Sequence, residues 1–558
     1  MDRFHFTLRI LLLILVVTQG PVFLAQTLTP DAVMYDLQAR CALTGGVLYR
    51  DIFEPNLPGV VWIHMAVRSI AGWSSQVLRG FDLLIFAASA FLLSRMVPGT
   101  GHCSGKPAGW GVVLLLSLFY LGTLEWCHCQ RDSWMLLPAL VALTLHSRWL
   151  VRCSASARLN NRTHFVLGSY EGAFWASAFW IKPHVAIPAI GVLIAGSLIL
   201  RQPRAVFLHG LGVLAAGILI GGLGIGWMMA NGCWDWFLDT MLSWNARYVQ
   251  SGRDRWTIEK FIVLNRHFSP WFWLHLPGML IAIQTLKRGL THSSPDHTIP
   301  PAEPRVLLSS LYIGWTCQAF LLQQPFDYVH VPGLLMAVTL CCAWLAEFDD
   351  QTSPARPLLK VACVGFLLCV ALTSPLLRPG RLSRVPTCWS ALLGYPLTPD
   401  AKDAISRIPL PRWTELQPML DRITKTGLAQ QSLLAHSCYL IHVYPEAGYQ
   451  APMRYVYLDV LARLFPEDRL LFLQAVADSS ARWVVADLVE SGWSGVVAEI
   501  PSAELLPAAL ESHPAGTLFP WNQTPVFRSG GYVLFRLDQP IGDISPDSIP
   551  LSAVRRQP

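Results

Sequence analysis

The chain has 558 residues, of which 53% are hydrophobic and 14% are charged, and its formal net charge is +6. A soluble protein covers its surface with roughly 25% charged residues, so this composition excludes a soluble globular protein. The excess positive charge is spread over many loops and forms no single basic patch, which excludes a nucleic-acid-binding protein.

Long apolar runs recur from the N-terminus to Leu377, and most are long enough to cross about 30 Å of hydrocarbon as a helix. A segment inside hydrocarbon has to satisfy its own backbone hydrogen bonds, so we predict that each run is helical. The runs cover residues 7–25, 57–72, 79–96, 108–126, 134–150, 165–181, 184–200, 205–229, 268–286, 306–323, 331–347 and 357–376.

The run at residues 57–72 differs from the others because it begins with Pro58-Gly59 and contains His64 and Arg68. We predict that this run lies along the membrane surface as an amphipathic helix. About eleven transmembrane helices then remain, and the predicted fold class is an all-α polytopic membrane bundle.

With eleven crossings, most of the short basic loops fall on one side of the membrane, which the positive-inside rule identifies as the cytoplasm. The basic residues on that side are Arg3, Arg9, Arg95, Lys106, Arg148, Arg152, Arg158, Arg162, Arg201, Arg204, Lys287, Arg288, Arg305, Arg356 and Lys360. The N-terminus is therefore predicted to be cytoplasmic, and everything after Leu377 to lie outside. The short loops favour the plasma (inner) membrane of a bacterium.

The composition becomes more polar after residue 376, which divides the chain into a transmembrane domain (1–376) and a small α/β extracytoplasmic domain (377–558). A helix is expected at Trp413–Gly427. Half-buried strands are expected at Leu434–Tyr444, Ala481–Leu488 and Gly531–Leu537. Cys388 and Cys438 both fall in the second domain, and the sequence leaves open whether they form a disulfide.

Polar residues at membrane depth are costly and mark candidate functional sites, and here they gather at the predicted outer ends of helices. In the outer loop at 26–78, Asp31 follows a proline and opens an amphipathic helix, where a role as N-cap would explain it equally well. Arg131-Asp132 opens a later apolar helix, and a mutual ion pair is its simpler explanation. Lys182 separates two apolar helices. Its alternative explanation is an interfacial lysine whose side chain snorkels to the membrane surface.

The last of these motifs is Tyr328–His330, which an aromatic turn at the membrane interface would also explain. Taken together, the motifs place two acids and two bases on one face of the bundle. An anionic lipid phosphate requires such a combination of charges.

This order of motifs resembles the GT-C superfamily of membrane glycosyltransferases, in particular the dolichyl-phosphate-mannose protein mannosyltransferase and aminoarabinose lipid A transferase types. The family's first outer loop holds an acid, then a tyrosine, then a Gly-x-x-Tyr stretch. The family's second acid, its Lys-Pro turn and its late Tyr-x-x-Pro element follow. The corresponding residues here are Asp31, Tyr35, Gly46, Tyr49, Arg50, Asp51, Asp132, Lys182, Pro183 and Tyr328–Pro332. The family's lysine before the interfacial helix is missing from Glu54–Gly59.

The resemblance implies inverting transfer of a sugar from a polyprenyl-phosphate donor to a lipid, glycan or protein acceptor on the outer face of the membrane. It implies that Asp31 is the general base, that Arg131 and Lys182 stabilise the leaving phosphate, and that Asp132 orients Arg131 or the acceptor. The other residues expected to bind substrate are Tyr35, Tyr49, Arg50, Asp51, Glu54, Tyr328 and His330.

No cofactor is required by this pattern. Some members of the family use a divalent metal ion, but no acidic pair here demands one. Cys127-His128-Cys129 has too short a spacing for a tetrahedral site.

Three other classes of function remain open. A lipid or glycan transporter (flippase) would carry charges near the middle of the membrane, and Glu171 is the main residue of that kind. A polysaccharide polymerase or ligase would use a large basic outer loop, such as residues 230–267. An inactive membrane scaffold would not need Asp31.

Overall fold

The computed structural model describes residues 2–97, 109–154, 159–254, 256–291, 303–348, 356–408, 411–491, 518–539 and 541. Lys106 and Arg158, which contribute to the predicted topology, lie outside these residues. The chain divides into two compact units. Unit 1 comprises residues 1–26, 57–229 and 252–395, and unit 2 comprises residues 27–56, 230–251 and 396–558. The first loop therefore groups with the C-terminal residues, although transmembrane helices flank it in the sequence.

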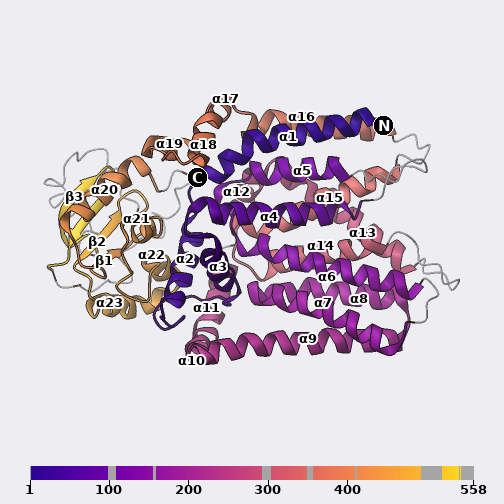
Figure 1. Cartoon of the computed structure of the whole chain (residues 1–558), viewed down its shortest axis with the longest axis horizontal. Helices are drawn as coiled ribbons and strands as arrows, with labels where there is room; N and C mark the ends of the chain where they lie inside the picture. Colours follow the sequence, from indigo (N-terminus) through magenta and orange to yellow (C-terminus); the bar gives the residue numbers. More distant parts are fainter. Residues whose placement is uncertain are drawn as a thin grey trace. The chain divides into compact units, whose positions relative to one another are not determined.

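Unit 1 is a bundle whose long helices lie side by side with nearly parallel axes (Figure 1). Its helices are α1 (Asp2–Ala25), α3 (Gly59–Ala71), α4 (Ser75–Ser94), α5 (Gly109–Gly122), α6 (Arg131–Ser154), α7 (Asn161–Ile181), α8 (Ala186–Leu200), α9 (Pro203–Ala230), α12 (Ile258–Phe268), α13 (His275–Thr291), α14 (Glu303–Leu321), α15 (Val331–Phe348), α16 (Arg356–Thr373), α17 (Pro379–Leu382) and α18 (Val385–Leu392). Single helical turns form η1 (Glu125–Cys127), η2 (Pro183–Val185), η4 (Trp271–Leu274), η5 (Asp327–His330) and η6 (Pro375–Leu377). Each of the predicted apolar runs overlaps one of these helices.

Six of the described helical segments are long and apolar enough to cross a membrane, namely those of α1, α4, α6, η2–α8, α9 and η5–α15. The prediction of a polytopic helical membrane protein is confirmed, whereas the count of eleven crossings stays a prediction. Helix α3 has 13 residues and is therefore only ~20 Å long. This length is less than the ~30 Å of a bilayer core and agrees with a helix that lies along the surface.

Helix α6 lies inside unit 1, where it packs against α4, α7, α8 and α15. Its apolar side chains are almost fully buried, as at Leu136, Leu140 and Leu143. Helix α9 is different, because Phe207 and Ile218 are more than 60% exposed. Such exposure of large apolar side chains is expected where a helix faces lipid.

The N-terminus of α3 touches the end of α7. A side chain at Gly59 would collide with the backbone of Trp180 and Ile181, which are the last two residues of α7. Small residues at such positions let membrane helices approach closely. Gly59 therefore fixes how near α3 lies to the end of α7.

Unit 2 combines short helices with one four-stranded sheet. The helical segments are α2 (Pro30–Leu43), α10 (Trp234–Asp239), η3 (Thr240–Trp244), α11 (Asn245–Asp254, of which residues 245–251 belong to this unit), α19 (Pro399–Ile405), α20 (Trp413–Thr426), η7 (Cys438–His442), α21 (Val443–Ala447), α22 (Leu458–Leu464), η8 (Pro466–Asp468) and α23 (Arg469–Ala477). The strands are β1 (Leu433–Ala435), β2 (Trp483–Asp487), β3 (Thr524–Ser529) and β4 (Tyr532–Arg536), in the order β1-β2-β4-β3. β1 and β2 are parallel, and the other pairs are antiparallel.

The predicted helix at Trp413–Gly427 and the strands at Ala481–Leu488 and Gly531–Leu537 are present as α20, β2 and β4. The predicted strand at Leu434–Tyr444 is wrong beyond Ala435, because the chain turns there into η7 and α21. The Tyr444 hydroxyl then accepts a hydrogen bond from the Ala435 N–H at 2.9 Å. A short apolar run has the same pattern in a buried helix and in a strand.

Candidate functional site

One end of unit 1 carries a buried ion pair between α6 and α7. The Lys182 ammonium lies 2.8 and 2.9 Å from the two carboxylate oxygens of Asp132, and it also contacts the side-chain oxygen of Gln323. Asp132 is fully buried, and Lys182 is 5% exposed. Asp132 stands in the first turn of α6, where the helix dipole stabilises a carboxylate. The structure therefore brings Asp132 and Lys182 together at one end of the bundle, and their role in binding or catalysis stays a prediction.

Further polar side chains surround this pair. Arg131, the first residue of α6, is 5% exposed. His184 of η2 and His330 of η5 both lie within electrostatic reach of Lys182, and Tyr328 is buried in the same turn as His330. Two basic side chains, Arg131 and Lys182, therefore lie close to the Asp132 carboxylate, and basic side chains of this kind are suited to binding a phosphate.

A second buried polar network begins in α4. The Asp82 carboxylate accepts hydrogen bonds from Trp134 Nε1 at 2.7 Å and from the Tyr120 hydroxyl at 2.8 Å. One turn earlier, Arg79 lies 3.4 Å from His128 Nδ1. Because Trp134 belongs to the first turn of α6, this network holds the end of α6 that carries the ion pair. Asp82 was not predicted from the sequence, although an acidic residue inside an apolar run is itself an indication of a functional site.

In unit 2, Asp31 lies in the first turn of α2 and is partly buried. The N-cap of α2 is Thr29, whose hydroxyl accepts a hydrogen bond from the Ala32 N–H. The alternative explanation of Asp31 as the N-cap is therefore wrong. Tyr35, one turn further along α2, is 5% exposed.

The rest of the first loop has its own internal contacts. Tyr49 is buried, and its hydroxyl donates a hydrogen bond to a backbone carbonyl of the same loop at 2.8 Å. Arg50 and Asp51 form an exposed ion pair at 2.7 Å, and the Arg50 guanidinium lowers the pKa of Asp51. Glu54 accepts a hydrogen bond from Gln38 of α2 at 2.9 Å. The contribution of these residues to substrate binding stays a prediction.

Two tyrosines that the sequence reasoning missed lie near Asp31 within unit 2. η7, which contains Tyr439, packs against α2. Burial raises the pKa of Tyr439 and Tyr457, and the neighbouring Asp31 carboxylate raises both further. The Tyr457 hydroxyl has no hydrogen-bond partner within the described part of the chain. About 400 residues separate these tyrosines from Asp31, so no local pattern connects them.

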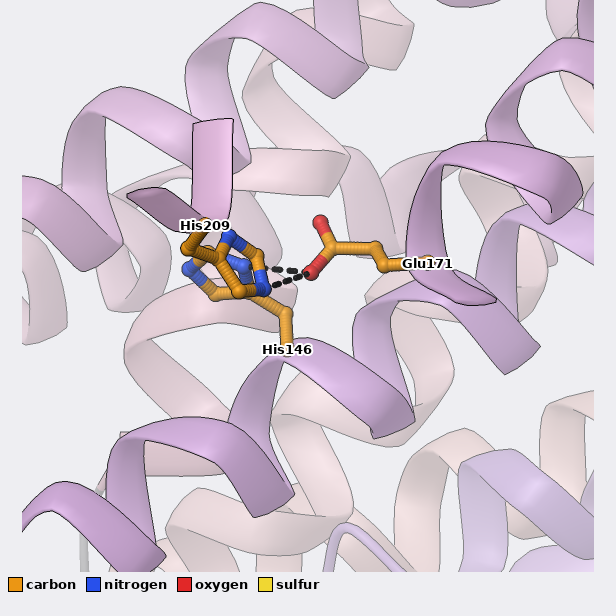
Figure 2. Close-up of side chains that lie close together, drawn as sticks. All are labelled: His146, Glu171 and His209. Carbon is orange, nitrogen blue, oxygen red and sulfur yellow. Dashed lines mark hydrogen bonds and ion pairs between the residues drawn. The ribbon is translucent and has the colours of Figure 1, made fainter. Parts of the chain in front are cut away.

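Two groups of side chains among the described residues have donor atoms close enough to share a metal ion. One group lies in unit 1, where three buried side chains face one another (Figure 2). The other lies in unit 2. Their members are His146, Glu171 and His209 in unit 1, and Cys438, Asp459 and Glu490 in unit 2.

The unit 2 group is held by a contact between two of its own residues and by a contact with the neighbouring Arg463. The Cys438 thiol donates to Glu490 at 3.2 Å, and Arg463 donates to Asp459 at 3.0 Å. Burial raises the pKa of the Glu490 carboxyl, and the nearby Asp459 raises it further. Cys388 and Cys438, whose pairing the sequence leaves open, are both free thiols.

Comparison with known proteins finds no matching family model and no matching curated sequence. Among solved structures, the chain is similar to ArnT from Cupriavidus metallidurans bound to undecaprenyl phosphate. That match has a TM-score of 0.54 at 13% identity and covers 96% of this chain and 99% of that one. The apo form of the same ArnT gives a TM-score of 0.53 at 13% identity, with 96% and 98% covered. The chain therefore shares the fold of this ArnT structure, in agreement with the resemblance drawn from the order of its motifs.

Proposed function

We propose that this protein is a membrane glycosyltransferase that moves a sugar from a polyprenyl-phosphate donor to an acceptor at the extracytoplasmic face of the plasma (inner) membrane. The observation that carries the proposal is the buried, cation-rich cluster of Arg131, Asp132 and Lys182 in a chain of this fold. Undecaprenyl phosphate, which the similar ArnT structure holds, is a lipid carrier of the same chemical class. We place the N-terminus in the cytoplasm, in agreement with the distribution of basic loops.

The leaving group of the proposed reaction is a polyprenyl phosphate. Arg131 and Lys182 stabilise its negative charge through charge-assisted hydrogen bonds. Lys182 engages both oxygens of Asp132, so we assign Asp132 to positioning Lys182. Tyr328 and His330 lie in the turn beside this cluster and are proposed to contact the donor.

The acceptor's hydroxyl or amine attacks the anomeric carbon from the side opposite the phosphate. The bond from this carbon to the phosphate oxygen breaks, the configuration inverts, and Asp31 takes the acceptor proton as general base. The support for Asp31 is that Thr29, and not Asp31, caps α2. We propose that Tyr35, Tyr49, Arg50, Asp51 and Glu54 bind sugar or acceptor hydroxyl groups.

The proposal is tested with the purified full-length protein in detergent and a panel of undecaprenyl-phosphate-linked sugars, by measuring release of undecaprenyl phosphate in the presence of a membrane lipid extract. Asp31→Asn is expected to lower this rate by about 10²- to 10⁴-fold, the usual contribution of a general base. Asp36→Asn is the matched control, because Asp36 is a partly buried acid in the same helix. Full activity of Asp31→Asn would exclude the proposed base.

The sugar and the acceptor are identified by comparing glycolipids and glycans of wild-type and deletion cells by mass spectrometry. We expect one glycan or lipid species to lose a single sugar unit in the deletion strain. Its restoration by the wild-type gene, and not by Asp31→Asn, would connect that species to this protein. Identical profiles in the two strains would count against a transferase.

A further inference from the structure

His146, Glu171 and His209 come from α6, α7 and α9 and point toward one another (Figure 2). All three are at most 2% exposed. His146 follows Asp132 by about four turns of α6, or ~21 Å along the helix axis. This group is therefore separate from the ion pair at the other end of α6.

The three side chains converge on one oxygen atom. Glu171 Oε2 lies 2.8 Å from His146 Nδ1 and 3.2 Å from His209 Nε2. The other carboxylate oxygen accepts a hydrogen bond from Trp175 Nε1 at 2.9 Å, and the His209 ring stacks on Trp149 with centroids 3.8 Å apart. Residues behind a metal ligand commonly hold it in place in this way.

The backbone also holds the group together. Gly168 of α7 and Gly212 of α9 face the opposite helix, where a Cβ atom would collide with the carbonyl oxygens of His209 and Phe165. Such close contact between glycines and a neighbouring backbone brings membrane helices together without large side chains. It places the start of α9, and with it His209, directly beside α7.

A simple ion pair does not account for this arrangement. One protonated histidine is enough to balance the Glu171 carboxylate, and His146 already donates to it. His209 Nε2 is buried 3.2 Å from the same oxygen, so this carboxylate meets two imidazoles where one would balance its charge. A cation between the two histidines and the carboxylate would occupy both the nitrogen lone pairs and the oxygen.

The three donor atoms all lie within 4.8 Å of one another, close enough to share a small transition-metal ion. Zinc bonds of about 2.0–2.1 Å place tetrahedral ligands about 3.3 Å from one another. The observed 3.2 Å already matches this spacing, and the observed 2.8 Å requires a widening of about 0.5 Å. Two imidazoles and one carboxylate form a common zinc donor set, which leaves a fourth position for water.

We propose that His146, Glu171 and His209 bind one divalent metal ion of the zinc class and thereby join α6, α7 and α9. The proposal concerns a structural role, so the reaction at the other end of α6 does not depend on it. The ion compensates the single buried carboxylate without requiring a proton on either imidazole.

The test uses the full-length protein purified with an affinity tag that contains no histidine, with metal content measured by mass spectrometry of the elements. After dialysis against Zn²⁺ and removal of excess metal, the wild-type protein is expected to retain about one zinc ion per chain. Substitution of Zn²⁺ by Co²⁺ is expected to give the visible absorption of a tetrahedral cobalt site. Removal of the metal with a chelator should lower the unfolding temperature, because an ion bound only by the native state stabilises it.

Glu171→Gln and His209→Gln should each lose the ion and the cobalt absorption. His275→Gln is the matched control, because His275 belongs to unit 1 and its Nδ1 contacts the Tyr312 hydroxyl at 2.8 Å, outside the proposed site. Absence of retained metal in wild type overturns the proposal, even where a variant fails to fold. Equal metal content in wild type and in a folded Glu171→Gln also overturns it.

Discussion

The two ends of α6 bury charge of opposite balance. At the first end, two basic side chains, Arg131 and Lys182, lie close to the Asp132 carboxylate. At the other end, the Glu171 carboxylate faces two imidazoles, which carry charge only when protonated. Uncompensated charge is costly in a medium of low dielectric constant. We therefore propose that the end with two basic side chains binds an anion and that the end with a carboxylate and two imidazoles binds a cation.

Replacing Lys182 should cause the largest loss of stability and of transfer activity. Lys182→Met leaves the Asp132 carboxylate buried without its cation, a change that costs about 3–5 kcal/mol in other proteins. We expect transfer to fall by at least about 10²-fold, the usual loss when a group that stabilises developing charge is removed. Thermal unfolding and the transfer assay measure the two effects. A stable, fully active Lys182→Met would contradict the comparison.

The double variant Asp132→Asn with Lys182→Met separates stability from function. It removes both members of the ion pair, so most of the lost stability should return. Transfer should stay low, because the lysine is still missing. Recovery of both properties together would mean that Lys182 serves only to balance Asp132.

Glu171→Gln tests whether the other end of α6 contributes to transfer. Since Glu171 lies about four turns away from the ion pair, we expect the transfer rate to stay within about 3-fold of wild type, a change of less than ~1 kcal/mol in the barrier. Steady-state rates at saturating donor give the measurement. A loss as large as that of Lys182→Met would show that the two ends do not act independently.

In unit 2, the Glu490 and Asp459 carboxyl groups lie near each other, so two acidic groups share one buried site. The pKa of Glu490 is raised above its ordinary value of 4.5 by burial and by Asp459. The folded protein therefore keeps a proton that the unfolded chain releases, and stability should fall as the pH rises above about 4.5 and level off beyond the raised pKa. Between pH 5 and 8 we expect the unfolding temperature to drop by about 2–4 °C.

Glu490→Gln should flatten this pH dependence and raise the unfolding temperature near neutral pH. Glu446→Gln is the control, because Glu446 is an exposed acid of the same unit. An unchanged pH profile in Glu490→Gln would rule out Glu490 as its source.

The smallest expected effect concerns Trp175, which donates to the outer oxygen of Glu171. Trp175→Phe removes this hydrogen bond and keeps most of the ring. We expect a loss of about 1 kcal/mol in stability and a several-fold weaker affinity for Zn²⁺, since such supporting partners tune metal affinity. Competition with a chelator of known affinity measures the change. Unaltered affinity would mean that the ring, and not the hydrogen bond, positions the carboxylate.

The helices of unit 1 were predictable because their apolar runs are long enough to cross a membrane. Shorter elements were not, as residues 436–444 show, because the tertiary contact between Tyr444 and Ala435 decides their conformation. β3 has no counterpart among the predicted strands, since Pro525 interrupts its pattern. The grouping of residues 27–56 with the C-terminal residues has no local signal at all.

The candidate site was predictable where one end of a helix collects polar residues, as with Asp132 and Lys182. The cluster of His146, Glu171 and His209 was not predictable from the sequence. Glu171 stands out alone as a charge inside an apolar run, but its partners His146 and His209 lie 25 residues before it and 38 residues after it. Only the glycine contact between α7 and α9 brings the second histidine to the carboxylate.

The glycine at the start of α3 links the position of this helix to that of Lys182. Gly59 touches Trp180 and Ile181, and the next residue along the chain is Lys182. A shift of α3 by the width of one methyl group would therefore push on the peptide that presents the lysine.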